Sequence, residues 1–269
     1  MNNTIRSLKS MISVSGWIAK FDADNAATVH VNVVFGDGLF GAEPHHKIRF
    51  RLALKRAEVV VRIPDGQPIH VIGSSVAYTP NSQKVTRETQ TQSTVEMSGH
   101  FAGELSATGA AFAAGGKASA DTRQTTSQTA IEDVRRYIVE HFTTDKSDNA
   151  WKVAHQEQRR VLSGAPWDPR TEPRLSVRRT AERNADGDKP SLTVEIRCRR
   201  QDLHIEGLQV KDDSIWRSFQ SKKNRDANLA AAEQVIKDEL VKAGFLNIPD
   251  LDEDFAELLV ADVIITEDW

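Results

Sequence analysis

The chain has 269 residues, of which 39% are hydrophobic and 27% charged, as in a globular protein able to bury one or two cores. Its formal net charge of −3 gives no reason to expect nucleic acid as a partner. No run approaches the ~18 consecutive apolar residues of a membrane-spanning helix, and the first residues lack the apolar segment of a secretory signal. We therefore expect a soluble, cytoplasmic protein; export without a signal peptide stays an open alternative.

The only cysteine of the sequence is Cys198, so the chain cannot form an internal disulfide. The flanking Arg197 and Arg199 could lower the pKa of this thiol and make it reactive. The simpler interpretation is a half-buried residue of a strand, and we adopt it.

Strand patterns dominate residues 1–80, which we predict to form an N-terminal β unit. Apolar and polar residues alternate over residues 29–33 and 48–55, the period of two that is typical of half-buried strands. Residues 59–63 continue as a strand up to the turn at 64–66, Pro-Asp-Gly, where proline presets φ and glycine accepts a positive φ. Residues 69–78 are predicted as the next strand.

The pattern of residues 131–269 predicts a C-terminal α+β unit. Residues 131–142 fit a helix and a strand equally well. Three further strands are predicted at residues 175–180, 192–198 and 203–210. Residues 192–205 repeat the pattern of residues 48–61. Two related β-hairpins, one in each half of the chain, would explain this repeat, and chance convergence of alternating strands would explain it almost as well.

The strongest helix pattern runs from Asn224 to Gly244, with Gly244 as its C-terminal stop. Its apolar positions, spaced by three and four residues, are Leu229, Ala232, Ile236, Leu240 and Ala243. The expected fold class is α+β, mainly β, with two small antiparallel-sheet units, a long inserted β-hairpin and one well-formed helix near the C-terminus.

The segment of residues 81–130 has a different composition, rich in Ser, Thr, Gln, Gly and Ala. Apolar or small residues occupy the odd positions from 95 to 107 and the even positions from 110 to 120. Opposed residues of an antiparallel hairpin have numbers with a constant sum, so both sets share one face only when that sum is odd. A two-residue loop at Thr108-Gly109 meets this requirement, and glycine suits the second position of a tight turn.

The predicted hairpin, residues 94–123, therefore has one small-residue apolar face and one polar face. Within it Ala107 faces Ala110 and Leu105 faces Phe112. Strands of ~3.3 Å per residue over positions 95–107 give an arm of about 43 Å, which the polar flanks at 86–94 and 122–129 could extend. The positions predicted to make its contacts are Val95, Met97, Phe101, Gly103, Leu105, Thr108, Gly109 and Phe112.

Three uses of this hairpin follow from its faces. It can fold over the protein's own sheet or stay as a solvated insert, because its apolar face is weak. It can also pair with another subunit as an assembly arm. Finally, it can enter a membrane, as strands of ~9–11 alternating residues do when oligomers close them into a barrel. Pore-forming toxins use long Ser/Thr-rich amphipathic hairpins, but no further motif ties this chain to such a family, and aromatic girdle residues are missing.

Charge is distributed unevenly along the chain. Arginine and lysine concentrate in residues 159–225, and no basic residue follows Lys242. The acidic-hydrophobic tail is predicted to contact a partner through Asp250, Asp252, Phe255, Leu258 and Trp269. For the charge distribution itself, the interpretation that we favour over a partner site is that the tail neutralises the basic strands within one fold. Aromatic residues make up only 6% of the chain, so we do not expect nucleic-acid binding.

The sequence contains no phosphate-binding loop, nucleophile elbow, HExxH or paired-cysteine motif. His45 and His46 could bind a metal with Glu43, but we expect adjacent residues of a loop or strand to point apart. His204 and Glu206 share one strand face, yet no third partner is visible. We therefore predict no cofactor and no metal, and we lean away from an enzyme.

Our leading hypothesis is a non-enzymatic interaction or assembly protein that self-associates through the hairpin and the acidic tail. The alternative is a soluble protein that oligomerises and inserts residues 94–123 into a membrane as a pore-forming protein. An enzyme whose site is assembled from scattered residues is the third hypothesis.

Overall fold

The computed structural model describes residues 4–8, 11–78, 84–91, 126–133, 137–157, 160–180, 189–210, 222–250 and 256–267. The chain divides into two compact units. The larger one, which we name the sheet unit, consists of Met1–Gln83 and Arg135–Trp269, and the smaller one, which we name the stem, consists of Lys84–Val134.

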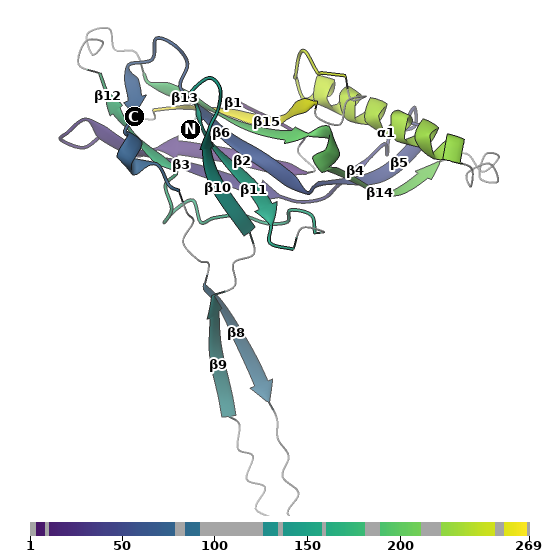
Figure 1. Ribbon diagram of the computed structural model, residues 1–269, viewed down its shortest axis with the longest axis horizontal. Helices are drawn as coiled ribbons and strands as arrows, with labels where there is room; N and C mark the ends of the chain where they lie inside the picture. The colour runs from purple at the N-terminus through teal and green to yellow at the C-terminus, as the bar shows by residue number, and fades with distance from the viewer. Residues whose placement is uncertain are drawn as a thin grey trace, which may run out of the picture. The chain divides into compact units, whose positions relative to one another are not determined.

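The largest sheet of the sheet unit is antiparallel and joins both halves of the sequence (Figure 1). In the part of the chain that the structure describes, its strands follow the order β1 (Thr4–Ser7), β15 (Glu257–Thr266), β13 (Ser191–Arg199), β6 (Arg56–Arg62), β11 (Asn149–His155) and β10 (Tyr137–Thr143). β6 pairs with β13 on one side and with β11 on the other. The boundaries at 80 and 131 therefore do not separate two sheet units, because strands from both halves complete one another's hydrogen bonding.

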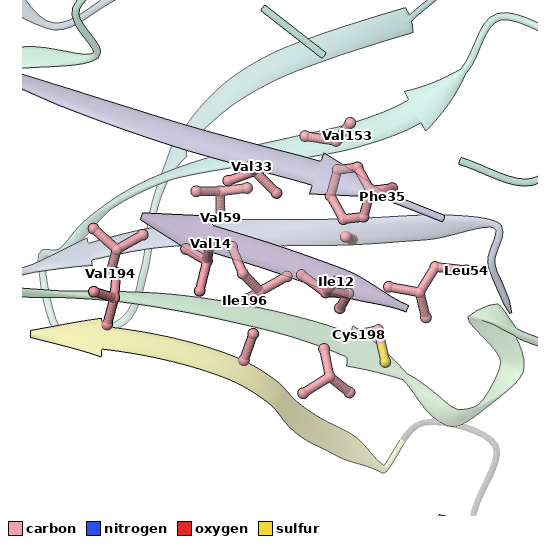
Figure 2. Close-up of a cluster of buried hydrophobic side chains, with 14 of the residues drawn as sticks. Ile12, Val14, Val33, Phe35, Leu54, Val59, Val153, Val194, Ile196 and Cys198 are labelled. Atoms are coloured by element: carbon pink, nitrogen blue, oxygen red, sulfur yellow. The ribbon is translucent and has the colours of Figure 1, made fainter. Parts of the chain in front are cut away.

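A second antiparallel sheet packs face to face on the first. Its described strands follow the order β2 (Ile12–Ile18), β3 (Ala26–Phe35), β12 (Leu175–Arg179) and β7 (Ile69–Val71). Figure 2 shows Val14 and Val33 of this sheet in one buried cluster with Ile196 of the first. A Cβ on Gly16 of β2 would lie 2.3 Å from Cδ1 of Ile265 in β15, so the small residue permits a close approach of the two sheets.

Two long segments continue from the first sheet into a third one. β5 (Ile48–Leu54) runs into β6, and β13 runs through the short 3-10 helix η3 (Arg200–Asp202) into β14 (Leu203–Val210). β6 pairs with β13, β5 pairs with β14, and β4 (Gly38–Phe40) adds to β5. The two segments of similar sequence thus pair with each other along their length and form one bent antiparallel ladder. The hypothesis of two related hairpins is wrong, because each segment pairs with the other and not with itself.

The helix α1 (Lys222–Lys242) forms near the C-terminus, as predicted. It ends in a Schellman motif, in which the N–H of Phe245 donates to the carbonyl of Leu240 at 3.0 Å and Gly244 takes φ +90°. Among its described side chains, the buried apolar ones are Ala232, Val235, Ile236 and Leu240. Leu229, expected on the apolar face, is 36% exposed. Across the described residues, no helix is long and apolar enough to cross a membrane.

Two local predictions change in the structure. Residues 69–78 do not form one strand, since β7 ends at Val71 and a 3-10 turn, η1 (Gly73–Ser75), follows. The ambiguous residues 131–142 fall in the end of β9 (Thr126–Asp133) and in β10, so the described part of this region is strand. The fold class itself is confirmed: the protein is mainly β, with several antiparallel sheets and a helix near the C-terminus.

Cys198 is 2% exposed and lies in the core, not half-buried as expected (Figure 2). Burial, followed by the carboxylates of Asp202 and Glu257, raises the pKa of its thiol. Arg197 and Arg199 do not activate it, because successive residues of a strand point to opposite faces. A reactive thiolate at this position is therefore excluded.

Candidate functional site

The stem contains a two-stranded antiparallel ribbon formed by β8 (Lys84–Thr91) and β9. Pairing is continuous from Lys84 opposite Asp133 to Thr91 opposite Thr126, and the residue numbers of every opposed pair add to 217. This constant sum fixes the register at Thr91 and Thr126, where the described ribbon ends.

The register of the stem agrees with the register predicted for the hairpin that it flanks. The loop at Thr108-Gly109 places Ala107 opposite Ala110, whose numbers also add to 217. The two values have separate origins, since one comes from the apolar pattern of residues 95–120 and the other from the hydrogen-bonded ladder of the stem. A slip of one residue would send the apolar set of one strand to the opposite face.

The contact positions predicted for the hairpin lie outside the described residues, so their roles stay predictions. They are Val95, Met97, Phe101, Gly103, Leu105, Thr108, Gly109 and Phe112. The flanks predicted at 86–94 and 122–129 are strand where the structure describes them, in β8 and β9.

The residues of the stem ribbon are mostly polar. Lys84 opposes Asp133, a pair of opposite charge, and Thr89 opposes Gln128. Opposed residues share one face of a ribbon, so neither face carries a row of apolar residue types. A ribbon with this composition gains little from burial and suits water on both sides.

The acidic tail enters the core of the sheet unit and does not form a free contact segment. β15 lies between β1 and β13 in the first sheet. Leu258, predicted as a contact residue, is 0% exposed, so that prediction is wrong. Asp250 forms an ion pair with Lys237, with 2.7 Å between Oδ1 and Nζ. The other predicted tail residues, Asp252, Phe255 and Trp269, lie outside the described residues.

Acidic groups of β15 and of the residue that follows it neutralise basic side chains of the same fold. Asp262, 4% exposed, accepts a hydrogen bond from Nε of Arg6 at 3.0 Å. Glu267, 3% exposed, pairs with Arg179. These contacts support the favoured interpretation of the charge distribution, neutralisation within one fold.

A cleft of about 620 Å³ opens in the sheet unit beside β5 and β14. Its charged lining includes Asp37, Arg51, His155, Arg160, His204 and Glu206. Asp37 pairs with Arg51, and Nε of Arg160 lies 2.7 Å from the carboxylate of Glu157. Arg51 is thus paired within the cleft, and Arg160 is paired with a residue outside its lining.

The cleft gathers histidines and carboxylates, the residue types that the enzyme hypothesis would need. Nδ1 of His155 accepts a hydrogen bond from the N–H of Glu157 at 3.0 Å. Among the described lining residues, no hydrogen bond joins Ser163 to a histidine, as a nucleophile and its base would require. His204 and Glu206, singled out in the sequence, have side chains 37% and 73% exposed and lie 3.9 Å apart.

The structure brings Glu43, His45 and His46 together, so the expectation that adjacent histidines point apart is wrong. Their ligand atoms all lie within 4.8 Å of one another. The cause is a β-turn with Pro44 at its second position, in which the N–H of His46 donates to the carbonyl of Glu43 at 3.2 Å. The alternation of an extended strand does not apply to a turn, so both rings lie near one carboxylate.

A smaller cleft, of about 120 Å³, lies over β6, β11 and β13 and contains Glu58. Desolvation, followed by the charge of Glu257, raises the pKa of Glu58 despite the nearby cations of Lys152 and Arg199. An acid whose pKa is raised by folding binds protons more readily in the folded state, so its contribution to stability falls as pH rises through that pKa. We expect Glu58→Gln to raise the unfolding temperature near neutral pH.

Thermal unfolding at neutral pH and near pH 4.5, the ordinary pKa of a glutamate, checks this expectation. The increase in unfolding temperature caused by Glu58→Gln should be smaller at the lower pH, where Glu58 of the unchanged chain is protonated in the folded state. Glu206→Gln is the control, because the side chain of Glu206 is 73% exposed and its neutralisation should change little. A less stable Glu58→Gln variant at neutral pH would mean that the neighbouring cations outweigh burial.

No known protein family and no curated protein matches this chain. Among solved structures, the chain is similar to Clostridium perfringens delta-toxin, at 11% identity and a TM-score of 0.32, over 78% of this chain and 80% of that one. It is also similar to the Clostridium perfringens NetB toxin in its membrane inserted form, at 10% identity and a TM-score of 0.27, over 73% of this chain and 84% of that one. Similarities at these TM-scores do not assign the chain to a family.

Proposed function

We propose that this chain assembles with copies of itself and inserts residues 94–123 into a membrane as a pore-forming hairpin. The register of the stem carries this proposal. Its sum of 217 is odd, as aligning the two apolar sets on one face requires, and equals the sum for a two-residue loop at Thr108-Gly109.

The length of the hairpin suits a bilayer. A transmembrane strand needs ~9–11 residues when it is tilted across a hydrocarbon core of about 30 Å. Residues 95–107, at ~3.3 Å each, reach about 43 Å and leave a margin for tilt. The polar stem then belongs to the water side, because neither of its faces offers an apolar row to lipid.

The two faces of the hairpin suit lipid and water. If the register of the stem continues into the hairpin, Met97, Phe101 and Leu105 would lie on one face with small residues between them. The opposite face carries Glu96 and Lys117, which would line a water-filled space.

Self-association is part of the same proposal. A lone hairpin has two outer edges, whose N–H and C=O groups would be left without partners in hydrocarbon. Hairpins from several subunits must therefore pair edge to edge before the strands can cross. The assembly role and the membrane role are then successive steps.

Dye release from lipid vesicles, run beside light scattering on the same protein, tests this proposal. Leakage together with a defined oligomer supports it. A defined oligomer without leakage would leave the hairpin as an assembly arm. A monomer that releases no dye from neutral or anionic vesicles would contradict both roles.

The register can be tested separately with paired cysteines. Met97→Cys with Ala120→Cys has the sum 217 and should form a disulfide on mild oxidation, because opposed Cβ atoms of a ribbon lie about 4.5–5.5 Å apart. Met97→Cys with Ser119→Cys places the second thiol on the other face and should stay reduced. Mass spectrometry of alkylated protein measures both variants, and equal oxidation of the two pairs would contradict the register.

A further inference from the structure

We infer that Glu43, His45 and His46 form a zinc-binding site in the turn that precedes β5. Two imidazole nitrogens and a carboxylate are ligands that Zn²⁺ takes in proteins, whereas Mg²⁺ and Ca²⁺ prefer oxygen ligands alone. The inference concerns the sheet unit and is independent of the hairpin.

The distances between the ligand atoms suit a tetrahedral zinc shell. Zinc bonds of about 2.0–2.1 Å at tetrahedral angles separate neighbouring ligand atoms by roughly 3.3 Å. Oε2 of Glu43 lies 3.1 Å from Nε2 of His45 and 3.7 Å from Nε2 of His46. All three ligand atoms lie within 4.8 Å of one another, so side-chain rotations that draw them closer would bring them onto one ion, with a fourth position left for water.

The burial of His46 is a second and separate observation. His46 is 7% exposed, and its Nε2 has no hydrogen-bond partner among the residues that the structure describes. Buried polar atoms of native proteins are nearly always satisfied, so this nitrogen calls for an explanation. The separation of 3.7 Å from the carboxylate of Glu43 is too long for a hydrogen bond. A metal ion bound beside Glu43 would give Nε2 of His46 the partner that it lacks among the described residues.

Lys242 competes with a metal ion for Glu43. Its Nζ lies 2.7 Å from Oε2 of Glu43 and 2.9 Å from Oε1 of Glu239. An incoming ion would take the same oxygen of Glu43, while the ammonium group keeps its contact with Glu239. Lys242 is the last residue of α1, so zinc binding would also break the ion pair that joins the end of the helix to this turn.

Two substitutions with opposite expected effects test the site. Isothermal titration of ZnCl₂ into the full chain, with any affinity tag removed, should show one site per chain. His45→Ala should weaken zinc binding at least about tenfold, because it removes a ligand whose side chain is 63% exposed and has little structural role. Lys242→Met should tighten binding, because it removes the competing cation.

His70→Ala is the matched control, since it removes one exposed histidine of β7, outside the cluster, and should leave zinc affinity unchanged. The inference is overturned if the unchanged chain binds no zinc, or if His45→Ala and His70→Ala weaken binding equally. It is also overturned if Lys242→Met weakens binding, because Lys242 would then support the zinc-bound arrangement instead of opposing it.

Discussion

Gly103→Asp should abolish the dye release that the unchanged chain causes in lipid vesicles. If the register of the stem continues through the hairpin, Gly103 would lie opposite Ala114 on the predicted apolar face, near the middle of the predicted membrane-crossing strands. A carboxylate facing hydrocarbon costs about 2–3 kcal/mol in each subunit, a factor of roughly thirty or more, and the cost recurs in every copy of an oligomer. The sheet unit should keep its unfolding temperature, because the substitution lies in the hairpin and not in the core.

Ser98→Asp is the matched control for this substitution. It adds the same charge to the same strand, but Ser98 has the parity of Glu96 and Glu104 and so belongs to the polar face. Leakage should therefore survive in Ser98→Asp. Equal loss of leakage in both variants would show that any added charge blocks insertion, and equal retention would show that the apolar face does not meet lipid.

Arg174→Ala should destabilise the sheet unit by about 3–5 kcal/mol. Arg174 is 1% exposed, its Nη2 lies 3.1 Å from the carboxylate of Glu172, and its guanidinium carbon lies 4.4 Å from the ring centroid of Trp167. The substitution leaves the carboxylate of Glu172, 7% exposed, without its counter-ion and opens a void beside Trp167. Denaturant unfolding measures the loss.

The double variant Arg174→Met with Glu172→Gln separates the charge from the packing. Burial lowers the pKa of Arg174, which means that the charged form already carries a desolvation cost in the fold. Replacing both charges with groups of similar size should therefore recover much of the stability that Arg174→Ala loses. If the single variant stays within about 1 kcal/mol of the unchanged chain, Glu172 does not depend on Arg174.

Several elements were predictable because their signals are local. The alternation at residues 48–54 produces β5, and the pattern that ends at Gly244 produces α1 with its Schellman motif. The hairpin register stays a prediction, with which the stem agrees, since the parity change at Gly109 requires an odd sum and the described pairs of the stem have one. Periodicity decides which face a residue occupies before any long-range contact forms.

The acidic tail shows where this reasoning failed. Its negative charges suggested an exposed contact segment, yet Leu258, Val260 and Val263 are fully buried in β15. These apolar residues were the signal that could have predicted a strand. A lone strand cannot hydrogen-bond its own backbone groups or bury its own apolar residues. The inner position of β15 in the sheet therefore depends on pairing with β1 and β13, which come from distant parts of the sequence.

By itself, the sequence determined the mainly β class and the helix, because these follow from the repeat of side chains along a few neighbouring residues; the hairpin at 94–123 stays a prediction. Tertiary structure alone decided that both halves share one sheet, that Cys198 is buried, and that Glu43, His46 and Lys242 meet. Residue 242 is far from residue 43 in the chain, and no local pattern encodes their contact. The physical reason is that burial and hydrogen bonding over the whole fold select which distant strands pair. Local periodicity permits many such pairings and does not specify one of them.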